Sequence, residues 1–563
     1  MSTTRRQGAT VLALTGLLGA AALTGATGAG AAPADELPVY AVRSEGITDE
    51  QVAALQRAFG LKSVERTAEG VVTFTDEERH LRVPSIDQGA GQPDESGQAT
   101  TRTAFDVAAI RALRAVPPQD ATKRVTETLR GIGLLPAEAT PTASHSTLDI
   151  VDGNGATVAS APLDTTVTFD FRLGGVPLEG PGSKVRVSLD GTGAVTQLTY
   201  AARQVVQVGL KPVLDLDLGY QKCVEVLGGV PLGAVQYAYS SGPLGSGQTH
   251  LEPYFRCQGV DPGENAPVFF LPAVVGSSLP EPDPAVPPRR STTASSATGN
   301  PATANSTTAS SATGDVGADS ISLVDVGSEG TGTCQGLYGV PNNITGFNNR
   351  FTSAVIPVQF SWTGPNAWEQ DFKDPAFAGG QDHLYTDDVD MTFYHGNGGP
   401  FGLSFSRCSS VNDATLRNTE ARWGNRDSEW MSLYTPSLLA TTASGQAWWQ
   451  RWGRAFRGLH QINGFETTIV QPGAFVSPAG SFGGRYANYL LRSSLRPVQR
   501  PMRVRDAWAQ ASIDTQPSYV RWATMGAMSG GNLANFNDYF WGRGAVGSDI
   551  TSPTGYWKIS GPS

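Results

Sequence analysis

The chain has 563 residues, and at ~150 residues per domain its length suggests three or four domains. Charged residues make up 16% of the chain, below the ~25% of an average soluble domain. The net charge of −10 disfavours a nucleic-acid partner, which would select a basic face. The repeats and long apolar runs of collagen-like, coiled-coil and polytopic membrane proteins are absent. Composition therefore predicts a soluble multidomain protein.

The first 34 residues have the pattern of a signal peptide. Arg5 and Arg6 precede an apolar stretch over 9–23, and small residues then form two A-x-A sites. The apolar run is too short to hold a bilayer. We expect a secreted protein, cleaved near Ala31 or Ala34, with no stable membrane anchor.

Export makes disulfides accessible to the four cysteines. Four cysteines allow three pairings, and the choice most local in sequence joins each cysteine to its neighbour. No CxxC spacing is present, so structural disulfides are favoured over a zinc site and no metal is expected. The pairs favoured are Cys223 with Cys257 and Cys334 with Cys408.

A step in composition divides the chain. All 11 tryptophans lie at or after Trp362. Before that step, residues 279–317 are rich in Ser, Thr, Ala and Pro and contain the string STTASSATG twice, so they cannot bury enough apolar surface to order. The sequence predicts a disordered linker at 279–317 between a front part and a domain over 318–563.

The front part has the pattern of an α+β fold, with an N-terminal region over 35–160. A capping box of Thr48 and Gln51 opens a predicted helix that runs to about Leu61, and a second helix is expected over 121–129. Residues 165–171 alternate between apolar and polar, which predicts a strand. A hairpin follows, with strands over 184–190 and 194–200 around a glycine turn.

The string GGVPLEGPGSKVRVSLDGTGAVTQLTY resembles PepSY/FTP modules, which occur in propeptides of secreted metalloproteases. The resemblance implies an inhibitory or chaperone-like module over 161–278. A helix over 218–227 and a strand over 250–257 would form either a second copy of the module or its completion. The chain contains no HExxH motif, so it is not a zinc metalloprotease of that kind.

The back part carries the candidate chemistry. An apolar strand ends at His395-Gly396, and a second strand over 427–435 leads into Thr435-Pro436-Ser437. In open α/β sheets the carboxyl ends of strands handle ligands. A helix over 446–456 and a strand over 458–467 are expected to follow.

Five blocks in order, FYHGNGG, Trp423-Gly424, SEWMSLYTPSLL, WWQRWGRAFRGLHQINGFET and VRDAWAQAS, resemble the exported family DUF6345. That family looks like caspase- and gingipain-type cysteine peptidases of clan CD. The resemblance implies a three-layer α/β domain with a histidine after one strand and a cysteine nucleophile after the next. Pro436, 41 residues after His395, stands where that cysteine is expected.

Proline has no thiol and no N–H, so the resemblance implies a degenerate site. His395 is the candidate general base, balanced against a histidine held in a tight loop. Ser437 is a weak alternative nucleophile, because a hydroxyl needs more help from a base than a thiol. The candidate ligand-binding positions are Gly396, Asn397, Gly398 and Pro436.

Other candidates favour structural roles. His460 falls in a predicted strand and is expected to be a core histidine. Asp387, Asp388 and Asp390 lack the EF-hand spacing, so solvated carboxylates at the start of a strand are favoured over a calcium loop. Helical spacing of three tryptophans predicts two in the core and one exposed, with a sugar platform as the minority interpretation; these are Trp448, Trp449 and Trp452.

Three hypotheses remain open. The back part is a degenerate caspase-like domain that binds a peptide or cell-wall polymer, or an active hydrolase using His395 with Ser437. Alternatively, both parts form an inhibitory or adhesion scaffold. No cofactor and no nucleic acid is expected, and the two parts are candidates for contact with each other.

Overall fold

A computed structural model describes most of the chain in two stretches, separated by residues 277–323. We call residues 36–276 the front half and residues 324–563 the back half. The predicted signal peptide, the predicted linker and Cys408 lie outside the described residues. The described ranges are 36–67, 69–94, 97–136, 138–227, 232–259, 268–274, 276, 324–335, 337, 339–405, 414–470, 476–493 and 500–563.

The back half is built on five parallel strands, and every residue of four of them is buried. They lie side by side in the order β16-β15-β17-β21-β24. An inner parallel strand is covered on both faces, whereas β16, at the edge of the five, has only one buried residue. Their bounds are β15 (Val326–Gly330), β16 (Val358–Thr363), β17 (Met391–His395), β21 (Trp430–Tyr434) and β24 (Gln461–Phe465).

Two separate cores cover the two faces of these strands. Successive side chains of a strand point to opposite faces. Phe393 therefore joins one core with the helices α5, α7 and α8, whereas Tyr394 joins the other core with Trp448 and Trp452 of α6. The helices are α5 (Val340–Ser353), α6 (Trp448–Trp452), α7 (Phe482–Leu490) and α8 (Val504–Thr515). The structure is thus a mixed α/β fold, with a central sheet covered on both sides.

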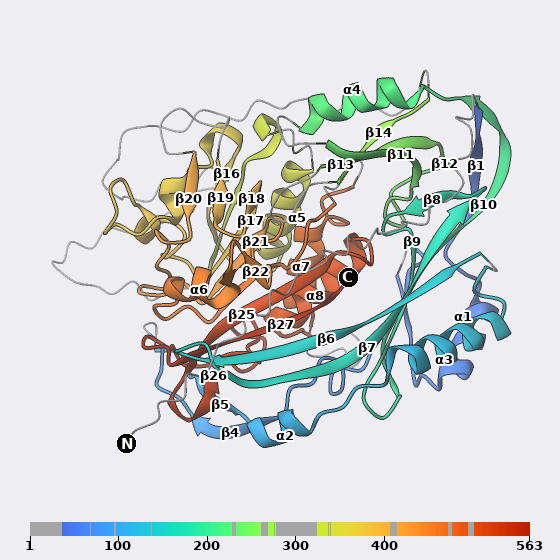
Figure 1. Ribbon diagram of the computed structural model, residues 1–563. Coiled ribbons are helices and arrows are strands. Elements are labelled where there is room, and N and C mark those ends of the chain that lie inside the picture. Colours follow the sequence, from blue (N-terminus) through green and yellow to red (C-terminus); the bar gives the residue numbers. More distant parts are fainter. Residues whose placement is uncertain are drawn as a thin grey trace, which may run out of the picture.

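The sheet of the back half continues into the front half. After β24 come the antiparallel strands β25 (Arg521–Ser529) and β27 (Gly555–Pro562). Strand β27 then pairs with β6 (Thr140–Asp152) from Gly555↔Asp152 to Ser560↔Thr147. Figure 1 shows β25, β27, β6 and β7 running side by side through the middle of the molecule.

Beyond β6, the front half adds its own antiparallel strands in the order β7-β9-β10-β3-β2. The hairpin expected around the glycine turn is present as β9 and β10. Strand β7 continues across the expected boundary between residues 160 and 161. The bounds are β2 (Glu65–Arg66), β3 (Val72–Thr75), β7 (Thr157–Leu173), β9 (Ser183–Leu189) and β10 (Val195–Pro212).

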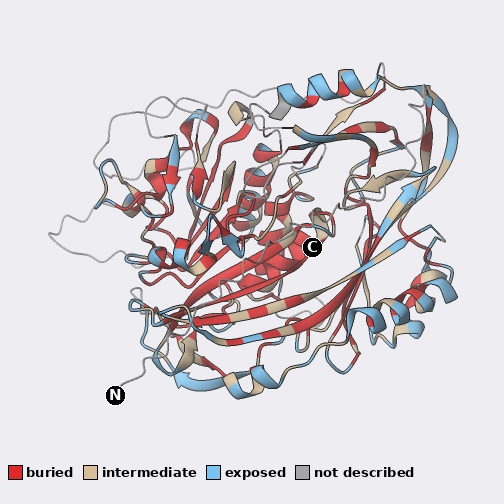
Figure 2. Cartoon of the chain, viewed as in Figure 1, coloured by how far each residue is buried: buried red, intermediate tan, exposed pale blue. Residues whose placement is uncertain are grey.

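Helices α1 (Asp49–Phe59) and α3 (Pro118–Gly131) belong to the core of the front-half sheet. Thr48 and Gln51 form the predicted capping box of α1, with both reciprocal hydrogen bonds present. In α3 the buried residues Ala121, Val125 and Leu129 recur every four positions, the spacing of one helix face. Figure 2 shows that the outer faces of both helices are exposed.

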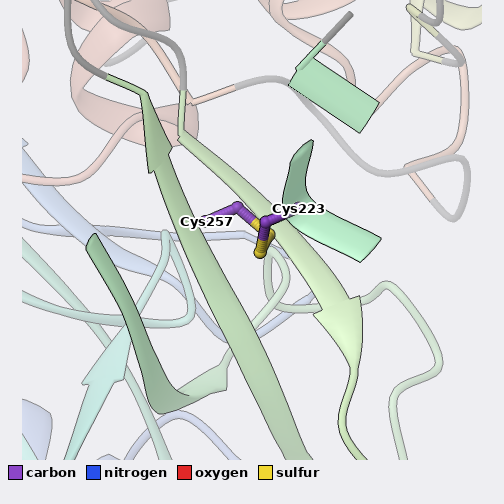
Figure 3. The surroundings of a disulfide bond; sticks show 2 residues. All are labelled: Cys223 and Cys257. Atoms are coloured by element: carbon purple, nitrogen blue, oxygen red, sulfur yellow. A yellow bond between two sulfur atoms is a disulfide. The ribbon is translucent and has the colours of Figure 1, made fainter. Parts of the chain in front are cut away.

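A second group of strands extends the front half away from the long sheet, and it carries the disulfide. Cys223 of α4 (Leu216–Leu227) is bonded to Cys257 of β13 (Pro253–Gly259), as Figure 3 shows. This confirms the first predicted pairing. The other strands of the group are β1 (Glu36–Glu45), β8 (Val176–Glu179), β11 (Leu232–Ser240), β12 (His250–Leu251) and β14 (Val268–Pro272).

Shorter elements complete the described chain. The helix expected over 446–456 is limited to α6, followed by a 3-10 turn over 453–455. None of the described helices is long and apolar enough to cross a membrane. The remaining elements are α2 (Val107–Ala112), β4 (Ser85–Ala90), β5 (Thr101–Phe105), β18 (Gly398–Gly399), β19 (Gly402–Ser404), β20 (Thr415–Arg417), β22 (Thr442–Ala443), β23 (Gln446–Ala447) and β26 (Leu533–Ala534).

Candidate functional site

The candidate site lies where the order in which strands are added to the parallel sheet changes side. From β15 the chain goes to β16 on one side and then returns to β17 on the other. Such a switch point leaves a crevice at the carboxyl ends of the strands, where α/β proteins bind ligands. His395 ends β17 at this edge, and Tyr434 ends the neighbouring strand β21.

His395 is buried, with 0% exposure, and its ring is held on several sides. The Asn343 side-chain amide lies 2.8 Å from Nδ1. Oδ1 of Asn343 accepts the backbone N–H of Gly483 at 3.1 Å, so the Nδ2 group is the one that faces the histidine. Nδ1 is therefore the acceptor, and the neutral ring carries its proton on Nε2. The Tyr434 ring packs edge-on against the imidazole with 4.5 Å between ring centroids.

The glycine-rich loop after His395 is packed against the ends of two strands. A side chain at Gly396 would come within 2.1 Å of the Tyr394 hydroxyl and 2.7 Å of Thr331 Oγ1. One at Gly398 would come within 2.6 Å of Thr435 Oγ1. The Asn397 N–H is bonded to Gln335. Close packing thus explains why small residues follow His395.

Pro436 and Ser437 lie in a buried turn after β21. Ser437 is 0% exposed and adopts φ of +53°, a left-handed conformation that is uncommon for residues other than glycine. Its backbone N–H donates to the carbonyl of Thr467 at 2.9 Å. Within the described structure, Ser437 Oγ is fully buried and has no hydrogen-bond partner.

The structure places the remaining candidates in the interior. His460 is buried, and its ring nitrogens lie 2.6 Å from Asp538 and 3.1 Å from Asp549. Burial lowers the pKa of His460, but the two carboxylates outweigh burial and raise it to about 9. Trp448 and Trp452 are buried and Trp449 is partly exposed, as the helical spacing predicted. The predicted bond between Cys334 and Cys408 involves a residue outside the described ones.

A group of carboxylates at the opposite edge of the sheet was missed by the sequence analysis. Asp325, Asp390 and Asp427 each offer an oxygen, and these oxygens lie within 4.8 Å of one another. We expected the carboxylates at the start of this strand to be exposed to solvent. That expectation is wrong for Asp387 and Asp390, which are 0% and 1% exposed, because the strand ends are covered. The available signal was an aspartate directly before each of two buried strands.

These carboxyl groups raise one another's pKa values. Burial, with Asp427 and Asp388 nearby, raises the pKa of Asp325 to about 7. Burial and the carboxylates of Asp427 and Asp325 likewise raise the pKa of Asp390 well above its usual range.

Asn343 is the other residue of the candidate site that the sequence did not reveal, because its contact with His395 depends on how α5 packs against β17.

Comparisons with known proteins match part of the chain to a protein family. No curated protein matches it. The crystal structure of an uncharacterized protein from Eubacterium rectale ATCC 33656 is similar over 42% of this chain and 82% of its own, with 9% identity and a TM-score of 0.21. Residues 326–561, which begin with β15, match the family described as "Domain of unknown function (DUF6345)", so the DUF6345 resemblance of the back half is confirmed.

Proposed function

We propose that the back half is an exported caspase-like domain that has lost hydrolytic activity and binds a peptide or a cell-surface polymer. Three features support the caspase-like interpretation. The parallel strands have the order β16-β15-β17-β21-β24. Along the sequence, His395 ends β17, the third of these five strands, and Pro436 follows β21, the fourth. In a cysteine peptidase of this kind, the histidine and the nucleophile would stand at these two places.

The hydrogen bond between Asn343 and His395 is the main support for the proposed loss of activity. A general base needs a ring nitrogen with an available lone pair. In His395 the Nδ1 lone pair accepts the Asn343 amide, and Nε2 carries the proton. Pro436 offers no nucleophile, and Ser437 is fully buried. The site therefore has neither an accessible nucleophile nor a histidine with a free lone pair to act as its base.

A second candidate is an active hydrolase with Ser437 as nucleophile. The left-handed φ of Ser437 supports it, because strained backbone at a strand-to-turn junction presents the serine in other hydrolases. A hydroxyl with no hydrogen-bond partner in the described structure is also available to a base. The complete burial of Ser437 weighs against this candidate.

The continuous sheet bears on the role of the front half. The β9–β10 hairpin with its turn at Asp190 supports a PepSY/FTP-like module. A removable inhibitory propeptide would separate from its domain, whereas here β6 and β27 are paired over six residues. Leu148 and Ile150 also share a core with Trp557 of the back half. We therefore favour a front half that stays attached as a scaffold.

Peptide hydrolysis by residues 35–563 tests the proposal. We expect no turnover of a mixed fluorogenic peptide library by wild type or by Pro436→Cys, because Asn343 still occupies His395. Binding to peptide arrays and to isolated cell walls should persist in His395→Ala. Turnover by wild type that is lost in both His395→Ala and Ser437→Ala would establish the active hydrolase instead.

A further inference from the structure

Three neighbouring parallel strands bring three aspartates together at their amino ends. Asp325 directly precedes β15, Asp390 directly precedes β17, and Asp427 lies three positions before β21. The strands are adjacent in the order β15-β17-β21, so residues far apart in the sequence meet here. One oxygen from each aspartate lies within 4.8 Å of the other two.

Hydrogen bonds hold the carboxylates of Asp325 and Asp390, and one carboxylate oxygen of Asp325 is left without a donor in the described structure. The Asp325 N–H donates to Asp390 Oδ2 at 2.6 Å, and Gln359 Nε2 donates to Asp325 Oδ2 at 2.7 Å. Asp325 Oδ1 has no hydrogen-bond partner among the described residues, although the side chain is only 7% exposed. Glu429, which is 4% exposed and lies between Asp427 and β21, has a second such oxygen, Oε2.

A buried carboxylate oxygen without a donor is costly, and the charges here reinforce one another. The charged groups that act on Asp325 are the carboxylates of Asp427 and Asp388. Those that act on Asp390 include the carboxylates of Asp427, Asp325 and Glu429. Arg426 forms an ion pair with Asp388 at 3.1 Å, and both side chains are about half exposed. The cluster is thus a mostly buried group of closely spaced carboxylates.

We propose that Asp325, Asp390 and Asp427 bind one divalent cation, and that calcium is the ion this site fits. Oxygen ligands at ~2.3–2.6 Å from Ca²⁺ stand at most ~4.6–5.2 Å apart across the ion, which accommodates the observed spacing. The ligand set is all oxygen, as hard cations prefer. Asp427 is only partly buried, so water can reach the ion and complete its six to eight ligands.

The bound ion would join the amino ends of β15, β17 and β21. These ends lie at the opposite edge of the sheet from His395, so the inference does not depend on any activity at that histidine. A site with three carboxylates and several waters belongs to the affinity range of extracellular modules, with Kd of about 10⁻⁴–10⁻³ M. Calcium would therefore act as a structural clamp in an exported protein.

Calcium titration of the intact chain, stripped with EDTA, tests the proposal. We expect saturable binding of one Ca²⁺ per chain by calorimetry and a rise in thermal midpoint that saturates with it, with a smaller response to Mg²⁺. Terbium should also bind and show emission sensitised by tryptophan, since Trp430 lies next to Glu429. No saturable heat and no change in thermal midpoint up to 10-fold above the expected Kd range would overturn the proposal.

Matched variants distinguish coordination of Ca²⁺ by three particular aspartates from general attraction of the ion to nearby negative charge. Asp427→Asn removes a ligand at a partly exposed position and should weaken Ca²⁺ binding at least tenfold, as should Asp325→Asn. Asp388→Asn removes the same charge nearby but outside the three ligands, so we expect less than a threefold effect. Equal weakening by Asp388→Asn and Asp427→Asn would contradict ligation by this set. The wild-type titration remains decisive if a variant fails to fold.

Discussion

The side-chain amide of Asn343 donates a hydrogen bond of 2.8 Å to Nδ1 of His395, and Asn343 is itself oriented by the backbone N–H of Gly483. This relationship joins α5, α7 and the end of β17 in one hydrogen-bonded chain. A peptidase would instead need this ring to be available as a base. The imidazole of the candidate site is thus held in a fixed orientation.

The contact determines which tautomer His395 adopts. We expect the Nε2–H form in wild type, because Nδ1 accepts from Asn343. Asn343→Asp places a carboxylate at Nδ1 and should reverse the assignment to Nδ1–H. Nitrogen-15 NMR of histidine-labelled protein distinguishes the two forms. An Nδ1–H signal in wild type would contradict the orientation of Asn343.

The left-handed backbone of Ser437 predicts how substitutions behave. Ser437→Ala removes a buried hydroxyl that has no partner in the described structure, so we expect unfolding free energy to change by less than about 0.5 kcal/mol. Ser437→Val puts a β-branched side chain at φ of +53° and should cost about 2 kcal/mol or more. Chemical denaturation of both variants measures the difference, and equal effects would contradict the strain.

The core shared by the two halves predicts that they unfold together. Ile150 is 0% exposed and packs in the same core as residues of β27. Ile150→Ala should lower the unfolding free energy by about 2–5 kcal/mol. Ile86→Ala makes the same change where the side chain is 47% exposed, and should cost far less. Calorimetry should show one transition for both halves, and two separate transitions would argue against a common core.

His460 predicts a stability that falls as pH rises. Its pKa of about 9 in the folded protein exceeds the ordinary value of 6.5. A raised pKa means that the folded state holds the proton more tightly, so this stabilisation is complete below pH 6.5 and is lost through pH 9. We expect about 3 kcal/mol to be lost across that window.

Urea denaturation at pH 6 and pH 9.5 measures the contribution of His460. His460→Gln should reduce the difference between the two pH values, because the titrating group is gone. His250→Gln is the control, since His250 is exposed. A control variant that flattens the pH dependence as much as His460→Gln would assign the effect to other groups.

The disulfide predicts a local loss of order on reduction. Cys223 and Cys257 are 34 residues apart and are both buried in the small core formed with Phe255 and Ala273. Closing a loop of this length stabilises the folded state by about 3–4 kcal/mol in the chain-entropy account. Replacing both cysteines by alanine should increase hydrogen exchange in α4 and β13, while β17 and β21 stay protected. Uniform loss of protection would show a global role.

Local patterns in the sequence predicted the elements that depend on neighbouring residues. The capping box at Thr48, the alternation in β7, the turn between β9 and β10 and the apolar strand ending at His395 are all present. Each depends on residues only a few positions apart, which fix backbone dihedrals and faces. The expected helix over 446–456 was too long, because a 3-10 turn replaces its second part.

Tertiary structure alone decided what meets across the sheet. The pairing of β6 with β27 joins residues about 400 positions apart, and no local pattern specifies it. Strand order likewise brings Asp325, Asp390 and Asp427 together and aligns Asn343 with His395. The sequence determined which side chains are available at strand ends. Packing of helices and strands determined their partners, because hydrophobic burial is non-directional and selects neighbours only through the shape of the whole core.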